Sequence, residues 1–135
     1  MTAEYIGRLT TAHPGITEVW LIGSRANDRA RPDSDWDYLT FTDDGNLLYS
    51  LHLDRQFNEP GIDLLLVVEY SALKPWGEAD GHNKKLRLNE DLEWKRISST
   101  EARYSEATKC DAAGRIDAAT VLGNRQYNLK VGVEK

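Results

Sequence analysis

The sequence contains one cysteine, Cys110, among its 135 residues. A single cysteine excludes an intramolecular disulfide, and no activating pattern surrounds this one, so an inert thiol is its expected role. No apolar run approaches the roughly 20 residues that a membrane helix needs. The first residues also lack the long apolar stretch of a signal peptide. These absences predict a cytoplasmic protein without membrane contact.

Basic residues are fewer than acidic ones, at 17 against 22, which gives a net charge of −5. This balance argues against bulk nucleic-acid binding as the main role, because such binding is driven by neutralising phosphates. A local basic pocket for one triphosphate remains compatible with it. The composition, 40% hydrophobic and 29% charged, is typical of a globular chain. Without repeats or a linker, residues 1–135 are expected to form a single domain.

The hydrophobic pattern predicts alternating helices and strands in the first half of the chain. The second half is harder to assign: 83–98 fits two short strands or a helix from Asn89, and 101–109 fits either type. A turn near 111–114 and two segments on either side of Gly123-Asn124 complete that part. The first-half elements are a helix at 2–12, strands at 16–22, 35–42 and 62–69, and a helix at 47–57 capped by Asn46.

Three aspartates occupy positions at which a carboxylate is unfavourable unless it has a partner. Asp35 and Asp37 alternate with Trp36 on a predicted strand, so both point to one face with their Cβ atoms about 7 Å apart. Asp63 interrupts an apolar run that otherwise resembles a core strand. Anions placed together on a partly buried face are costly unless a cation lies between them. Hard carboxylate oxygens of this kind suit Mg²⁺.

The predicted strand at 16–22 runs into Gly23-Ser24 and then a short helical turn. Backbone N–H groups and the helix dipole at such a junction form a cradle for phosphate. Gly23 permits close approach of a ligand to the backbone, and Ser24 adds a hydroxyl donor. Arg25, with Arg29 and Arg31 beyond it, can supply positive charge to the same triphosphate.

Each feature alone has a plainer interpretation. An Asp-x-Asp after a proline is common in solvated turns, Asp63 follows Gly61 at the mouth of a strand, and Gly-Ser after an apolar run is common. The histidines have no metal-ligand spacing, and Trp76 and Trp94 are expected to pack in the core or a loop rather than to stack on a base. The basic residues Lys84, Lys85, Arg87, Lys95 and Arg96 fit a solvated face or a contact to a phosphate-bearing acceptor.

The conjunction and order of these features resemble the nucleotidyltransferase superfamily typified by DNA polymerase beta, and most closely its small stand-alone bacterial members. The matching segments are Ile22-Gly23-Ser24, Asp35-Trp36-Asp37 and Ile62-Asp63-Leu64. The resemblance covers about residues 16–69 and implies an α+β fold, with a small mixed sheet and helices packed on one side. Many relatives have glycine where this chain has Asp28, a residue that tolerates the left-handed conformation.

The resemblance also implies a chemistry: transfer of a nucleoside monophosphate from an NTP, with ATP the first candidate, to an unknown acceptor hydroxyl, with release of pyrophosphate. By matching position, Asp35, Asp37 and Asp63 would be catalytic and would hold two Mg²⁺ ions. Asp63 would also lower the pKa of the acceptor hydroxyl or take its proton. Gly23 and Ser24 would hold the β- and γ-phosphates, with Arg25 and Arg31 as further nucleotide-binding residues.

A second hypothesis keeps the fold but not the reaction. Small relatives act as non-catalytic or partner-dependent proteins in toxin–antitoxin pairs, so a small helical partner protein is the alternative expectation. The complete set of three acids favours an active enzyme. The short chain favours the alternative, because larger transferases of the superfamily hold the acceptor with an added helical domain.

Overall fold

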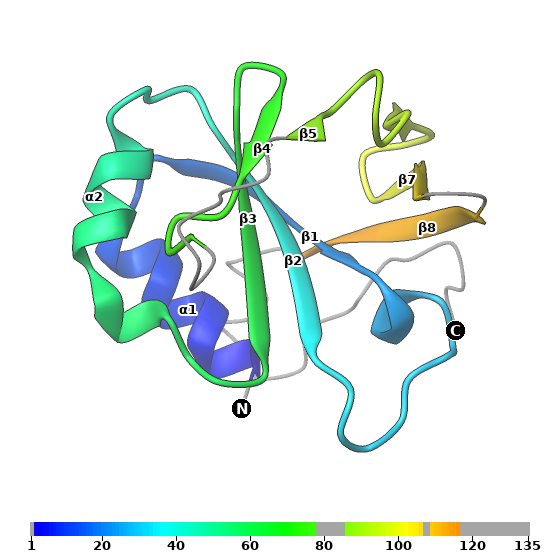
Figure 1. The fold of residues 1–135 in the computed structure, drawn as a ribbon, viewed down its shortest axis with the longest axis horizontal. Helices are drawn as coiled ribbons and strands as arrows, with labels where there is room; N and C mark the ends of the chain where they lie inside the picture. The colour runs from blue at the N-terminus through cyan, green and yellow to red at the C-terminus, as the bar shows by residue number, and fades with distance from the viewer. Residues whose placement is uncertain (1, 78–85, 107–108, 117–135) are drawn as a thin grey trace.

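The computed structural model describes residues 2–77, 86–106 and 109–116. Their strands form one mixed sheet in the order β5-β4-β3-β2-β1-β8-β7-β6 (Figure 1). The pair β2–β3 is parallel, and the other pairs in this part of the chain are antiparallel. The strands are β1 (Ile16–Ile22), β2 (Trp36–Thr42), β3 (Ile62–Val68), β4 (Ser71–Leu73), β5 (Leu86–Arg87), β6 (Lys95–Arg96), β7 (Glu101–Glu106) and β8 (Lys109–Ile116).

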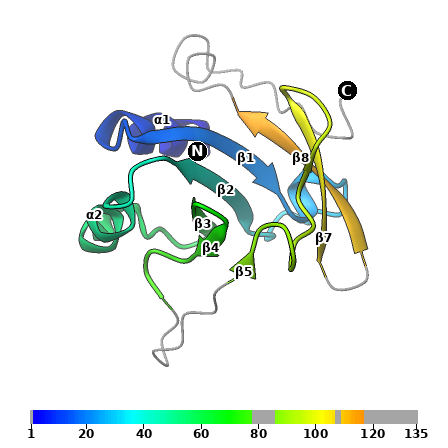
Figure 2. The same cartoon turned by 90° about the horizontal axis from the view of Figure 1, so that it is seen from above.

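Both α-helices cover the same face of this sheet (Figure 2). Helix α1 (Thr2–Ala12) buries Tyr5, Ile6 and Leu9, and α2 (Leu47–Leu53) buries Leu47 and Leu51. Helix α2 lies in the crossover that a parallel β2–β3 pair requires, and the 3-10 turn η2 (Arg55–Phe57) follows it. The expected α+β fold, with a mixed sheet and helices on one side, is confirmed.

The opposite face of the sheet carries a second apolar cluster built around Trp20, Leu39 and Val67. Because side chains alternate along a strand, these residues point away from the helices. The cover comes from the segment 86–104, which contributes Leu88, Leu92, Ala102 and Tyr104, with Trp94 packed edge-on against Trp20 at a centroid distance of 5.2 Å. The segment 86–104 therefore covers the helix-free face.

Several predictions for this later segment need correction. The turn near 111–114 is wrong, because pairing with both β1 and β7 holds β8 extended from Lys109 to Ile116. A helix from Asn89 is also wrong. The two short strands expected in 83–98 exist as β5 and β6, but they pair with β4 and β7 rather than with each other. Gly123-Asn124, His82, Lys84 and Lys85 lie outside the described residues.

The first half matches the predicted elements within a residue or two, with two local differences. The helix expected at 47–57 stops at Leu53, and η2 follows it. Asn46 occupies the cap position without a side-chain cap hydrogen bond. The carboxylate of Asp44 instead accepts the N–H of Asn46 at 2.9 Å. Within the described ranges, no helix is long and apolar enough to cross a membrane.

Candidate active site

Three strand ends meet where β1 finishes and β2 and β3 begin. Ile22 pairs with Asp37 across β1–β2, and Asp37 pairs with Asp63 across the parallel β2–β3 ladder. Alternation along the strands places both carboxylates on the helix-free face, with Leu39 and Leu65. They line one pocket of about 250 Å³, bounded by Ile22, Gly23, Asp37, Tyr38, Asp63, Leu65 and Tyr104.

Asp35 lies apart from this pair. It is exposed, precedes the first residue of β2, and is absent from the pocket lining. In the described ranges, no group of three histidine, cysteine, aspartate or glutamate residues is placed to hold a metal ion. The structure thus brings together two of the three predicted acids. Two carboxylates still fit Mg²⁺, which is commonly held by one or two carboxylates together with substrate phosphates.

Gly23 forms the turn between β1 and the 3-10 turn η1 (Ser24–Ala26), with φ 78° and ψ −159°. A Cβ atom at this position would overlap the Asp37 carboxylate and lie 3.2 Å from the Asp37 Cβ. Glycine is therefore required both by the backbone conformation and by the close approach of Asp37. The Asn27 side chain donates to the Gly23 carbonyl at 2.8 Å and holds the turn in place.

The loop between the Gly-Ser turn and β2 is braced by Arg25. Its guanidinium lies over the Trp36 ring at 4.4 Å and donates to the carbonyls of Pro32, at 3.2 Å, and Ser34, at 2.9 Å. These contacts tie the start of the loop to its end, directly before Asp35. Arg31 is exposed, and its backbone N–H donates to the Ser34 hydroxyl at 2.8 Å.

Asp28 lies at the tip of the same loop with φ 59°. Aspartate tolerates this left-handed conformation better than most residues, which agrees with the expectation that the turn survives the replacement of glycine. The departure from the family pattern leaves the turn intact.

Two residues at the site escaped sequence reasoning. Lys74 places its Nζ 3.7 Å from the Asp63 Oδ1. The Tyr104 hydroxyl accepts the Gly23 N–H at 2.7 Å. Tyr104 comes from β7, 81 residues further along the chain, and Lys74 follows the unpredicted strand β4. Only the pairing of distant strands could have identified them, since neither residue belongs to a local motif.

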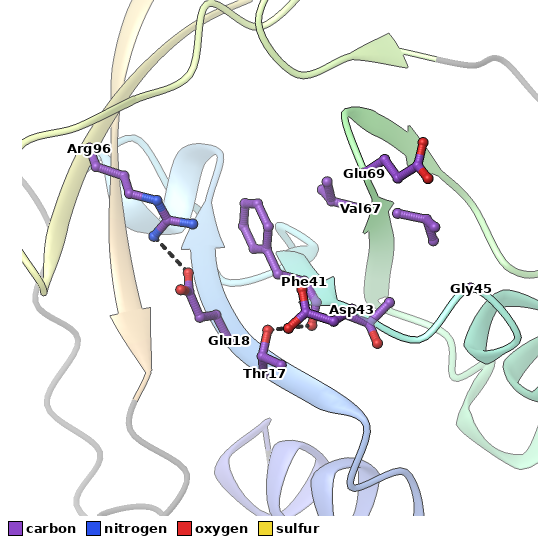
Figure 3. A pocket seen from close by; sticks show the side chains of 10 residues that line it. Thr17, Glu18, Phe41, Asp43, Gly45, Val67, Glu69 and Arg96 are labelled. Atoms are coloured by element: carbon purple, nitrogen blue, oxygen red, sulfur yellow. Dashed lines mark hydrogen bonds and ion pairs between the residues drawn. The ribbon is translucent and has the colours of Figure 1, made fainter.

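A larger cavity of about 420 Å³ lies at the other end of the same sheet face (Figure 3). Its lining includes Phe41, four residues from Asp37 along β2 and so about 13 Å away. There Arg96 forms an ion pair with Glu18 at 2.7 Å and lies over the Phe41 ring at 5.0 Å. Arg96, predicted to be part of a basic cluster, is thus paired within the protein. The cavity is too distant to hold a ligand that also contacts Asp37 and Asp63.

The remaining candidates have structural roles. Trp76 donates its indole N–H to the Leu51 carbonyl at 2.8 Å, and Trp94 packs in the apolar cluster of the helix-free face. His13 contacts Asp54 at 2.8 Å, and His52 contacts the Pro75 carbonyl at 2.8 Å. The contacts of Trp76 and Trp94 agree with the plainer interpretation, in which both tryptophans pack in the core or a loop.

Comparison with known proteins gives one match. The family model described as the nucleotidyltransferase domain matches residues 3–104. The match extends well beyond the segment 16–69 that carries the motifs, and it includes Lys74, Tyr104 and the cover of the helix-free face. No curated protein and no solved structure matches the chain.

Proposed function

The chain belongs to the nucleotidyltransferase domain family, and from this premise we propose that it transfers a nucleoside monophosphate from an NTP to an acceptor hydroxyl in a Mg²⁺-dependent reaction. The observation that carries the proposal is the pairing of Asp37 with Asp63 beside the Gly23 turn, on the rim of one pocket. Two carboxylates next to a turn built for close approach suit a cation bound to a triphosphate.

Asp37 and Asp63 would hold Mg²⁺, with Asp35 joining them from the exposed end of the loop. When bound, Mg²⁺ neutralises charge on the phosphates and stabilises the attacking and leaving oxygens of an in-line displacement. Placing two like charges in register on neighbouring strands is otherwise unfavourable, because directly opposite like charges repel. The donor set therefore supports a site for a cation.

The Gly23-Ser24 turn would bind the β- and γ-phosphates, with the Ser24 backbone N–H and hydroxyl as donors, because the Gly23 N–H already donates to the Tyr104 hydroxyl. Arg31, exposed on the same loop, is available to add positive charge. Arg25 remains a nucleotide-binding candidate, although its guanidinium lies over the Trp36 ring and donates to the loop carbonyl of Ser34. We propose that Arg25 mainly fixes the geometry of the loop and that contact with phosphate is its secondary role.

In the transfer step, the acceptor oxygen attacks the α-phosphorus and forms the new O–P bond. The bond from the α-phosphorus to the bridging oxygen breaks, and pyrophosphate leaves with the electron pair. Asp63, which is 43% exposed, takes the hydroxyl proton. Its exposure supports this role, because the acceptor must reach it from solvent.

The decisive test incubates the protein with each α-³²P-labelled NTP, Mg²⁺ and candidate acceptors, and measures pyrophosphate and labelled products. We expect a labelled product with at least one NTP, ATP being the first candidate, and its loss in Asp37→Asn. Absence of both product and Mg²⁺-dependent NTP binding by calorimetry would refute the proposal. The family match favours the transferase over the non-catalytic alternative.

A further inference from the structure

Tyr104 joins the core of the helix-free face to the turn of the proposed site. The residue is 2% exposed, and its ring packs beside Trp94 at a centroid distance of 6.3 Å. Strand β8 separates β7 from β1 in the strand order, so the sheet must curve for this side chain to reach Gly23. Packing fixes the ring, and the hydroxyl emerges at the pocket that contains Asp37 and Asp63.

Gly23 is held from three sides. Its N–H donates to the Tyr104 hydroxyl at 2.7 Å, and its carbonyl accepts from the Asn27 side chain at 2.8 Å. On the third side, the Asp37 carboxylate lies so close that a Cβ atom at position 23 would not fit. Any movement of the Gly23 peptide is therefore a movement of the phosphate turn relative to Asp37.

We propose that Tyr104 is a positioning residue of the nucleotidyl-transfer site, and that its hydroxyl fixes the Gly23 turn at the distance from Asp37 at which phosphate and cation are bound together. This inference rests on the proposed function. Gly23 needs this constraint because a glycine has no side chain and broad conformational freedom. Its backbone position must therefore be fixed by contacts with other residues. Tyr104 supplies that constraint from a rigid, buried ring.

Tyr104→Phe is the direct test, because it keeps the ring in the core and removes only the hydroxyl. Tyr5→Phe is the matched control. Tyr5 is also buried, and its hydroxyl also bonds to the backbone at 2.7 Å, donating to the Phe57 carbonyl on the helix-covered face. Both variants lose one buried hydroxyl contact to the backbone, but only Tyr104→Phe loses it at the site.

We expect Tyr104→Phe to lower kcat by roughly 10- to 100-fold per folded molecule, the cost of misplacing reacting groups by a fraction of an ångström to an ångström. KM for the acceptor should stay within a factor of about 3, since the contact is made to Gly23 and not to the acceptor. Tyr5→Phe should lower the thermal midpoint yet leave kcat unchanged. Amide exchange at Gly23 should accelerate in Tyr104→Phe and not in Tyr5→Phe.

Three results would overturn the inference while the proposed function stands. These are an unchanged kcat in Tyr104→Phe, a loss of activity that only follows the unfolded fraction, and tighter NTP binding, which would make the hydroxyl a competitor of phosphate. A wild-type protein that neither binds nor turns over any NTP overturns the proposed function, and this inference with it. Gly23 exchange still reports in that case whether Tyr104 holds the turn.

Discussion

Asp37 lies directly opposite Asp63 in the parallel register of β2 and β3, and Gly23 packs against the Asp37 carboxylate from the adjoining strand end. Gly23 and Asp63, which are 40 positions apart in the sequence, therefore both adjoin the Asp37 side chain. Asp37 is thus the centre of the site, whereas Asp35, its partner in the Asp-Trp-Asp motif, lies exposed at the entrance of the strand.

Asp37→Asn should separate activity from stability. We expect transfer to fall by roughly 100-fold or more, because the variant loses a proposed Mg²⁺ ligand and loss of one preorganised electrostatic group typically costs that much. The thermal midpoint should stay close to that of wild type, because asparagine has nearly the same shape and volume as aspartate. Activity assays and thermal unfolding check both. Asp43→Asn, at the exposed far end of the strand, is the control and should change neither; equal losses in the two variants would contradict the assignment.

Gly23→Ala should destabilise the protein by about 1–3 kcal/mol, the range for an unfavourable backbone conformation, with the Asp37 clash in addition. Gly61→Ala is the matched control, because Gly61 also has a positive φ of 83° but no atom within 4 Å of its Cβ position. Urea unfolding of both variants measures the difference. If Gly61→Ala is as destabilising as Gly23→Ala, backbone conformation alone explains the requirement and the contact with Asp37 contributes little.

Arg25→Lys should weaken the loop even though it keeps the charge. The stacked guanidinium and its two carbonyl hydrogen bonds are together worth about 1–3 kcal/mol, and a lysine cannot reproduce the planar fork. Chemical unfolding should detect this loss. Arg31→Lys, at an exposed position of the same loop, should stay within about 0.5 kcal/mol of wild type. Equal stability of the two variants would show that the brace contributes nothing.

Lys74→Met should tighten binding of Mg²⁺ at the acid pair by roughly two- to tenfold, because it removes a positive charge beside Asp63. Stability should change by less than about 1 kcal/mol, since both partners are substantially exposed. Calorimetric titration with Mg²⁺ at low ionic strength measures the first effect, and Lys74→Arg, which keeps the charge, is the control. Weaker cation binding in Lys74→Met would count against Asp63 as a ligand.

Unfolding at acid pH should reveal how much the Asp54 carboxylate, which contacts His13 and Gln56, contributes to stability. Hydrogen bonds from Gln56 and His13 lower the pKa of Asp54. Its contribution to stability is therefore fully present above the ordinary aspartate pKa of about 3.9 and is lost as the pH falls through the lowered value. Asp54→Asn should flatten this part of the stability profile, and Gln56→Ala should flatten it partly. An acid limb identical to wild type in Asp54→Asn would contradict this assignment.

The first half of the chain could be predicted closely because its signals are local. Val19–Ile22 is a continuous apolar run followed by a glycine, and Asp37 and Asp63 are the charged residues in otherwise uncharged strands. The later strands carry no such signal: Lys109–Ile116 contains a glycine and three charged residues before its last position, and it resembles a turn until its neighbours are known. Pairing with β1 and β7 supplies the hydrogen bonds that keep it extended.

The amino-acid sequence by itself determined the family of this protein. The residue types and their spacing mark the Gly-Ser turn, the paired acids and the third acid as candidates, because charged groups are rarely placed in apolar strands without a partner. Only the tertiary structure decided which groups meet. The register of two parallel strands joins Asp37 to Asp63 and leaves Asp35 outside, and the curvature of the sheet brings Tyr104 to Gly23. Such contacts depend on how distant segments pair, which no local pattern encodes.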